Sequence, residues 1–178
     1  MAAITMLMLF AVLGIAMPSA EPLTVVRNLR PEQYAGRWYE VARLPNRFQN
    51  KCSGEVTAEY TVRPEGGFTV INRCRESDGR MTDAAGVARV VRGAPTSVLQ
   101  VRFAPALLSL LPFVWGDYQV IALDDRHSYS VVGTPDRKYL WILSRTLQMD
   151  PDRYTRLVAI AGEQGFDVSQ IVKTRQSQ

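Results

Sequence analysis

Gly36-Arg37-Trp38-Tyr39-Glu40 opens a stretch of strand-like sequence that runs to Arg43. It is the first of eight such stretches in the chain. In the second, residues 56–62, apolar and polar side chains alternate, as expected for a strand that buries one face. Short turn sequences rich in Gly, Pro and Asp separate most of the stretches. The six later ones cover residues 68–73, 86–92, 99–103, 118–123, 129–132 and 139–144.

A helix pattern follows the eighth stretch. Asp150 suits an N-cap, Pro151 suits the first helical position, and apolar residues at helical spacing lead to a predicted end at Gly165. Residues 166–173 predict a short final strand. The predicted fold class is all-β, an eight-stranded antiparallel up-and-down β-barrel with one C-terminal α-helix and a short final strand. Closure removes the sheet edges, and eight strands leave room for one small ligand.

The order of these features resembles the lipocalins over residues 29–173. Gly36 and Trp38 match the Gly-x-Trp that begins the first strand in that family, and Arg145 matches the arginine that ends the eighth. The resemblance implies that Trp38 plugs the closed end of the barrel with Arg145 across its ring, a cation–π contact worth about 1 kcal/mol. These three residues are therefore assigned a structural role. Three stretches are similar to the bacterial, apolipoprotein D-like branch of the family; they are Pro45–Phe48, Val120–Asp124 and Tyr139–Arg145.

The first twenty residues predict a targeting signal. Residues 1–20 carry no charge, and the apolar run Ile4–Ala16 is followed by the small residues Pro18-Ser19-Ala20. This pattern is typical of a secretory signal peptide and leaves residues 21–178 as one lipocalin-like domain. Because a basic start is missing, an uncleaved anchor and a start codon further upstream stay open. The cysteine of a bacterial lipobox is also missing, so we expect an exported protein in the periplasm or at the periplasmic face of the outer membrane, without a lipid anchor.

The predicted compartment decides how the two cysteines, Cys52 and Cys74, are interpreted. In an oxidising space a disulfide between them is the expected state, worth about 3 kcal/mol in the chain-entropy model. The alternative is a pair of unrelated buried cysteines. If the first strand starts at the closed end, the loops after strands one, three, five and seven lie at the open end. Both cysteines then fall at the open end, beside the same hairpin.

The apolar faces of the strands predict a ligand cavity. Alternation places one set of side chains inside the barrel, and the resemblance to apolipoprotein D adds those of strands six and eight. Glu40 and Gln119 are the polar exceptions, expected to bond a ligand head group, each other or water. The alternative is that all these side chains simply fill the barrel. The predicted ligand-binding residues are Glu40, Tyr60, Val62, Phe68, Val70, Leu99, Val101, Phe103, Gln119, Ile121, Tyr139, Trp141 and Leu143.

These residues and the resemblance together favour a carrier or store of fatty acids, lysophospholipids or similar amphiphiles at the cell envelope. Burial of an acyl chain drives such binding at about 0.8 kcal/mol per methylene. Neither a cofactor nor a metal is implied. One open-end loop, Ala106–Trp115, is almost wholly apolar and suggests a lid, a homodimer contact or a membrane contact. A protein that works at a membrane surface or on a partner through this loop is therefore a second hypothesis.

Catalysis and nucleic-acid binding find little support. His127, the single histidine, lies with Asp124 and Ser128 in a turn predicted at the closed end, where we expect it to be solvated. No Gly-x-Ser-x-Gly motif occurs, so we expect no enzyme; the alternative is a lipid-modifying thiol enzyme if a cysteine is free. The net charge is +4, but the basic residues are scattered, which argues against a nucleic-acid partner.

Overall fold

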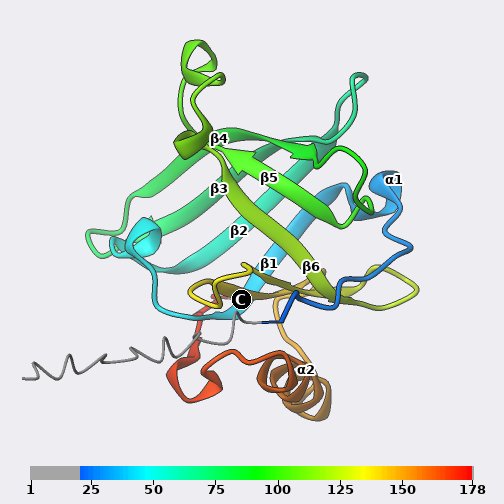
Figure 1. Ribbon diagram of the computed structural model, residues 1–178. Helices are drawn as coiled ribbons and strands as arrows, with labels where there is room; N and C mark the ends of the chain where they lie inside the picture. Colours follow the sequence, from blue (N-terminus) through cyan, green and yellow to red (C-terminus); the bar gives the residue numbers. More distant parts are fainter. Residues whose placement is uncertain (1–20, 178) are drawn as a thin grey trace, which may run out of the picture.

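A closed barrel of eight antiparallel strands forms the body of the protein in the computed structural model, which describes residues 21–177 (Figure 1). The predicted signal peptide lies outside the described residues. In sheet order, each strand pairs with its neighbour in sequence from β2 to β8, and β1 pairs with both β8 and β2, which closes the barrel as predicted. The strands are β1 (Gly36–Arg43), β2 (Cys52–Val62), β3 (Phe68–Glu76), β4 (Met81–Val90), β5 (Val98–Arg102), β6 (Gly116–Leu123), β7 (Tyr129–Gly133) and β8 (Leu140–Ser144).

The turn between β2 and β3 depends on two glycines, Gly66 and Gly67. Arg63 and Gly67 are joined by a backbone hydrogen bond of 3.1 Å. Gly66 and Gly67 have φ angles of +92° and +77°, which side chains with a Cβ rarely adopt. At Gly67 a Cβ would also lie 2.1 Å from the carbonyl oxygen of Ala88 on β4. The turn therefore needs glycine for its conformation and for its contact with the next strand.

The helical parts are one long helix and several short segments. Helix α2 (Pro151–Glu163) starts as predicted: the Asp150 side chain accepts a 2.9 Å hydrogen bond from the Arg153 amide. A four-residue helix, α1 (Pro31–Tyr34), was not predicted and covers one end of the barrel. Four 3₁₀ turns complete the set; they are η1 (Arg47–Gln49), η2 (Ala106–Leu108), η3 (Pro112–Val114) and η4 (Val168–Gln170).

The final strand predicted at residues 166–173 is wrong in length. Only β9 (Val172–Lys173) pairs with the sheet, because Asp167 caps the turn η4 by accepting from the Ser169 amide. Strand β1 pairs with β2 over Gly36–Tyr39 and then with β9 at Ala42 and Arg43. The C-terminal tail thus stands between β1 and β2 in one half of the barrel.

Two buried clusters follow from this arrangement. An inner cluster fills part of the barrel, and an outer cluster includes Leu157 and Ala161 of α2. Figure 1 shows α2 against the outside of the barrel. Membership of a cluster shows which way a strand residue points, since directly paired residues share a face. On β8, for example, Leu143 belongs to the inner cluster, whereas Leu140 and Ile142 belong to the outer one.

Candidate ligand-binding site

The barrel has a closed end, marked by α1 and Trp38. The Trp38 ring is fully buried and its Nε1 donates a 2.8 Å hydrogen bond to the Tyr34 carbonyl. The Arg145 guanidinium lies 3.9 Å from the centre of that ring and donates to the carbonyls of residues 33, 34, 35 and 37. Arg145 thus ties α1 and the start of β1 to the end of β8. The predicted cation–π contact between Trp38 and Arg145 is confirmed.

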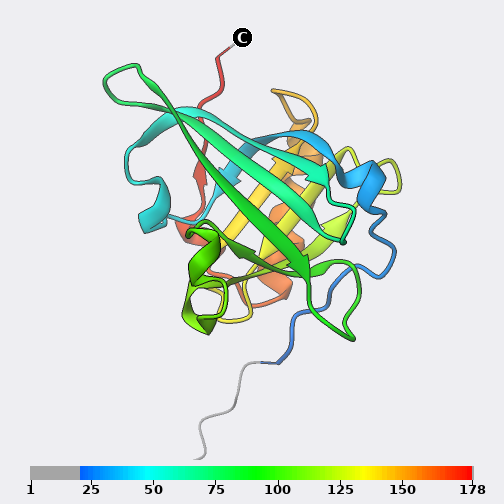
Figure 2. The ribbon, with the colours of Figure 1, turned by 90° about the horizontal axis from the view of Figure 1, so that it is seen from above.

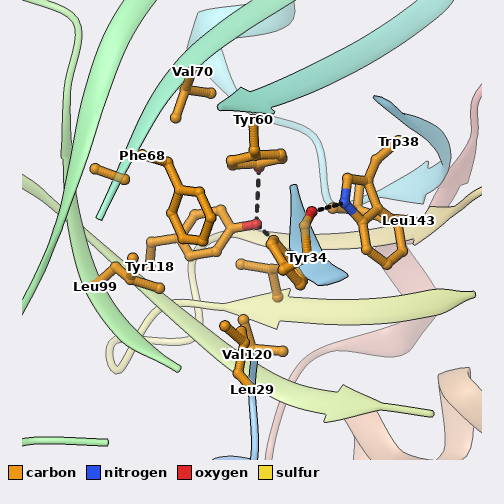
Figure 3. Close-up of a cluster of buried hydrophobic side chains, with 12 residues drawn as sticks. Leu29, Tyr34, Trp38, Tyr60, Phe68, Val70, Leu99, Tyr118, Val120 and Leu143 are labelled. Carbon is orange, nitrogen blue, oxygen red and sulfur yellow. Dashed lines mark hydrogen bonds between the residues drawn. The ribbon is translucent and has the colours of Figure 1, made fainter. Parts of the chain in front are cut away.

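Above this plug, tyrosines form the floor of the interior (Figure 3). The Tyr118 hydroxyl bonds those of Tyr34 and Tyr60 at 2.8 and 2.9 Å, and Tyr34 also reaches the Ser130 hydroxyl at 3.3 Å. Burial raises the pKa of all three tyrosine hydroxyls. Phe68 packs edge-on against Tyr60, with ring centres 5.7 Å apart. Tyr60 and Phe68 therefore belong to a filled floor, and a ligand would meet them only from above.

The other half of the barrel carries small side chains on the inner face of β4. Strand β4 presents Thr82, Ala84, Gly86 and Ala88 to the interior, because they pair with the inner residues of β3 from Cys74 down to Phe68. All four are small, and Thr82 and Ala84 are exposed although they face inward. The inner face of β4 beyond its pairing with β5, which covers Val87–Val90, is thus accessible to solvent.

Phe103 lines the same open half. A Cβ on Gly86 would lie 2.7 Å from the Phe103 ring, so the glycine makes room for the ring on the inner face. The ring is 43% exposed. Orientation toward the interior agrees with the prediction for Phe103.

Aromatic rings from β8 and the loop before it line the opposite wall. Tyr139 and Trp141 stack with ring centres 6.0 Å apart, and Phe48 from η1 packs on Tyr139 at 5.4 Å. The Trp141 Nε1 donates a 2.9 Å hydrogen bond to the side-chain oxygen of Gln49. Trp141 is half-buried and packs on the inner cluster, as expected for a wall of the cavity.

A polar cluster lies between these walls. Glu40 is 2% exposed, and its carboxylate accepts hydrogen bonds from Arg43 at 3.0 Å, from Gln49 at 2.6 Å and from the Thr174 hydroxyl. Strict alternation from Trp38 would turn Arg43 outward, so the sequence pattern does not reveal its inward orientation. A bulge between Glu40 and Ala42 shifts the register, so Arg43 pairs with Trp141 and shares its inner face.

The orientation predicted for β6 is wrong. Ile121 lies in the outer cluster with α2, and Gln119 lies on the same side by alternation. Tyr118 and Val120 occupy the inner face instead, since Tyr118 pairs with the inner residue Leu99. Both faces of β6 are apolar because α2 covers the outer one, so alternation alone leaves the two orientations equivalent.

The remaining predicted lining residues have the expected orientation. They are in the inner cluster or packed against it, from four strands: Val62, Val70, Leu99, Val101 and Leu143. Contact of any of these side chains with a ligand stays a prediction.

The apolar loop 106–115 stands at the open end with η1, opposite α1 (Figures 1 and 2). Leu110 and Phe113 are 92% and 80% exposed, so the loop does not fold back as a lid in this structure. Its base is fixed by Trp115, whose Nε1 donates to the Ser109 carbonyl at 2.9 Å. On the outer wall the Arg89 guanidinium lies 3.8 Å from the centre of the Trp115 ring.

The predicted disulfide is confirmed. Cys52 and Cys74 are bonded, with Cα atoms 5.6 Å apart, at the open end of the β2–β3 pair. Neither residue offers a free thiol in this state, which removes the nucleophile of the thiol-enzyme alternative.

The turn that holds His127 lies at the closed end as predicted. The prediction that its side chain is solvated is wrong. His127 is 3% exposed, and its Nε2 accepts a 3.3 Å hydrogen bond from the Arg30 amide. The N-terminal segment that passes over the turn has no periodic pattern, so the sequence did not reveal this cover. The Asp124 carboxylate accepts from the backbone amides of Ser128 and Tyr129. The His127 Nε2 and the Asp124 carboxylate therefore each accept hydrogen bonds from backbone amides.

Three further observations concern the choice of site. Within residues 21–177, no three His, Cys, Asp or Glu side chains are grouped so that they hold a metal ion. No helix in that range has the length and hydropathy needed to cross a membrane. A groove on the outer wall is lined by Arg73, Arg75 and Glu55, but Arg75 is paired with Glu55 and Arg73 with Glu59, both at 2.7 Å. The barrel interior is thus the better candidate site.

The barrel, its plugged end and its accessible interior define a lipocalin. The family model described as a lipocalin-like domain matches residues 29–176, and the chain belongs to this family. Outer membrane lipoprotein Blc of Escherichia coli K12 is 39% identical over 170 residues, covering 93% of this chain and 92% of that protein. Temperature-induced lipocalin-1 of Arabidopsis thaliana is 38% identical over 162 residues, covering 90% and 87%.

More distant proteins share the fold. Apolipoprotein D of Mus musculus is 27% identical over 161 residues, covering 86% of this chain and 80% of that protein. Among solved structures, lobster apocrustacyanin A1 matches with a TM-score of 0.66 at 19% identity, covering 83% and 79% of the two chains. The recognition of a lipocalin from the sequence is confirmed.

Proposed function

We propose that the protein carries or stores a single-chain lipid, a fatty acid or lysophospholipid, in the open half of its barrel. The observation that supports this most directly is the exposure of Thr82 and Ala84 on the inner face. Small residues there leave space, while the Trp141 wall and the Phe103 ring supply apolar surface. Lipocalin barrels of eight strands hold one small ligand.

The energetics favour an acyl chain as the part that enters. The filled floor of tyrosine and phenylalanine rings blocks passage to the closed end, so the tail would end above Tyr60. Each buried methylene contributes about 0.8 kcal/mol, and ten of them contribute about 8 kcal/mol before the costs of association. Micromolar binding is within that range.

The cell envelope is the proposed place of action. The predicted signal peptide at residues 1–20 supports export, and relatives from Escherichia coli and Vibrio cholerae are named outer membrane lipoproteins. We propose that the mature protein works in the periplasm or at the periplasmic face of the outer membrane.

Native mass spectrometry of the full exported chain, with and without removal of lipid, tests the carrier function. We expect one acyl lipid per barrel before lipid removal, and its return when fatty acid or lysophospholipid is added. Trp141→Ala removes part of the wall and should weaken that return. A chain that stays empty with every added lipid would overturn the carrier function.

We further propose that the loop 106–115 contacts a lipid bilayer. Leu107, Leu110 and Phe113 are exposed, and Phe48 on the neighbouring open-end loop is 64% exposed with Arg47 stacked on its ring. A basic group next to apolar side chains suits an anionic membrane surface. Docking in this orientation would turn the open end of the barrel toward the lipid.

Sedimentation with phosphatidylethanolamine–phosphatidylglycerol vesicles tests the membrane contact. Leu110→Asp with Phe113→Asp should abolish sedimentation, whereas Leu147→Asp, an exposed leucine after β8, should leave it unchanged. Equal sedimentation of the loop variant and the wild type would overturn the membrane contact. So would a wild-type dimer in analytical ultracentrifugation that becomes a monomer in the loop variant without any vesicle binding.

A further inference from the structure

The polar cluster of Glu40 and Arg43 lies inside the proposed lipid cavity. The bulge in β1 turns Arg43 to the inner face beside Trp141, where its side chain is 15% exposed. Charged side chains are rarely placed in such a position unless they are paired or bind something. Here the Glu40 carboxylate has its hydrogen-bond partners, whereas the Arg43 guanidinium has donors without one among the described residues.

The hydrogen bonds of the cluster are unevenly used. Three donors hold the Glu40 carboxylate: Arg43, Gln49 and Thr174. Arg43 uses only Nη1, which donates to Glu40 and to the Thr174 hydroxyl. Its Nε is buried and has no partner among residues 21–177. The cluster therefore has unused hydrogen-bond donors, and they are the N–H groups on the Nε–Nη2 edge of the Arg43 guanidinium.

The chemistry of that edge selects its partner. Two parallel N–H groups match the two oxygens of a carboxylate or phosphate, and such charge-assisted pairs are about twice as strong as neutral hydrogen bonds. A hydroxyl or ester offers a single neutral acceptor and leaves one donor unpaired. A low-dielectric setting beside Trp141 sharpens the difference.

We propose that Arg43 recognises the anionic head group of the bound lipid, so the barrel prefers amphiphiles with a carboxylate or phosphate to neutral ones of the same chain length. Glu40 acts as the positioning residue: it holds Nη1 and leaves Nε and Nη2 without a partner in the described part of the chain, as donors for the ligand. This inference rests on the proposed carrier function and adds the class of head group.

Isothermal titration of the delipidated full chain with dodecanoate, dodecyl phosphate and dodecanol tests the inference. The first two ligands separate a carboxylate from a phosphate source, and the third has the same chain without charge. We expect the wild type to bind at least one anionic ligand about 10-fold more tightly than dodecanol, as one charge-assisted pair would provide. Arg43→Lys should keep part of this preference, since it keeps the charge without the fork.

The double variant Glu40→Gln/Arg43→Met removes both charges together, so that no unpaired carboxylate is left buried. It should bind all three ligands within about 2-fold of one another, with the dodecanol affinity close to that of the wild type. The matched control is Arg37→Met/Glu59→Gln, a pair 3.9 Å apart on the outer face of β1 and β2, which should keep the preference.

The outcomes separate the two proposals. An equal affinity of the wild type for the three ligands, or the same preference in the Glu40→Gln/Arg43→Met variant, would overturn the role of Arg43 and leave the carrier function intact. Failure of the wild type to bind any of the three would overturn the carrier function itself.

Discussion

The two halves of the barrel are built from the same strands but differ in the size of their inward side chains. In the closed half the inner face carries large rings, Trp38, Tyr60, Phe68 and Tyr118, which are buried and fill the space. In the open half β4 presents small residues that stay exposed although they face inward. The size of the inward side chains thus decides where a lipocalin barrel is a packed core and where it is a container.

The two tryptophans on the inner face should behave in opposite ways. Trp38→Ala removes a fully buried ring together with its hydrogen bond to Tyr34 and its stacking on Arg145, so we expect a loss of about 3–5 kcal/mol in the free energy of unfolding. Trp141→Ala should cost less than about 2 kcal/mol, because the ring is half-buried and partly solvated. Urea denaturation measures both; equal losses would contradict the division into core and container.

The buried tyrosines predict a loss of stability at alkaline pH that originates in the closed half. Burial raises the pKa of Tyr34, Tyr60 and Tyr118 above the ordinary 10.0, so the folded protein keeps protons that the unfolded chain releases. Their contribution is present below pH 10 and is lost as the pH rises above it, by up to about 1.4 kcal/mol per pH unit for each group.

Tyr60→Phe removes one of these groups and should reduce the slope of stability against pH above 10 by about 1.4 kcal/mol per unit. Urea denaturation at pH 9, 10 and 11 supplies the slopes. An unchanged slope in the variant would show that Tyr60 does not contribute to the alkaline loss.

The smallest effect is expected where the tail bridges the open half. The Gln176 side chain donates 2.9 Å hydrogen bonds to the carbonyls of Glu40 and Val56, across the gap between β1 and β2. Gln176→Ala should lower the free energy of unfolding by about 1 kcal/mol. Gln148→Ala, an exposed glutamine after β8, should change it by less than about 0.5 kcal/mol. No difference between the two variants in thermal melts would argue against the bridge.

The fold could be predicted because it depends on local signals. Alternation in residues 56–62, the Gly-x-Trp of Gly36 and Trp38, and the cap at Asp150 each report a nearby geometry. Together with Arg145 they were enough to identify the family. The disulfide between Cys52 and Cys74 followed from the oxidising compartment that the predicted signal peptide implies, and the predicted strand directions agreed with it.

The site was predicted less completely, and the errors share a physical origin. Bulges at Val41 and Ile121 insert one residue into a strand and reverse the alternation beyond it, so Arg43 was missed. On β6, α2 covers the outer face and makes it as apolar as the inner one. His127 is covered by a segment that lies 97 residues earlier at Arg30. Each error depends on a contact between distant parts of the chain.

The central claim is that the open half of the barrel is a container for lipid, and Ala84 offers the most direct test. Ala84 and Ala85 are neighbouring exposed residues on β4, but Ala84 faces the interior and Ala85 faces the outside. We would measure the affinity of delipidated Ala84→Trp and Ala85→Trp for lauroyl lysophospholipid by calorimetry. The account predicts a loss of at least about 10-fold for Ala84→Trp and wild-type affinity for Ala85→Trp. Equal affinities in the two variants, with both folded, would contradict it.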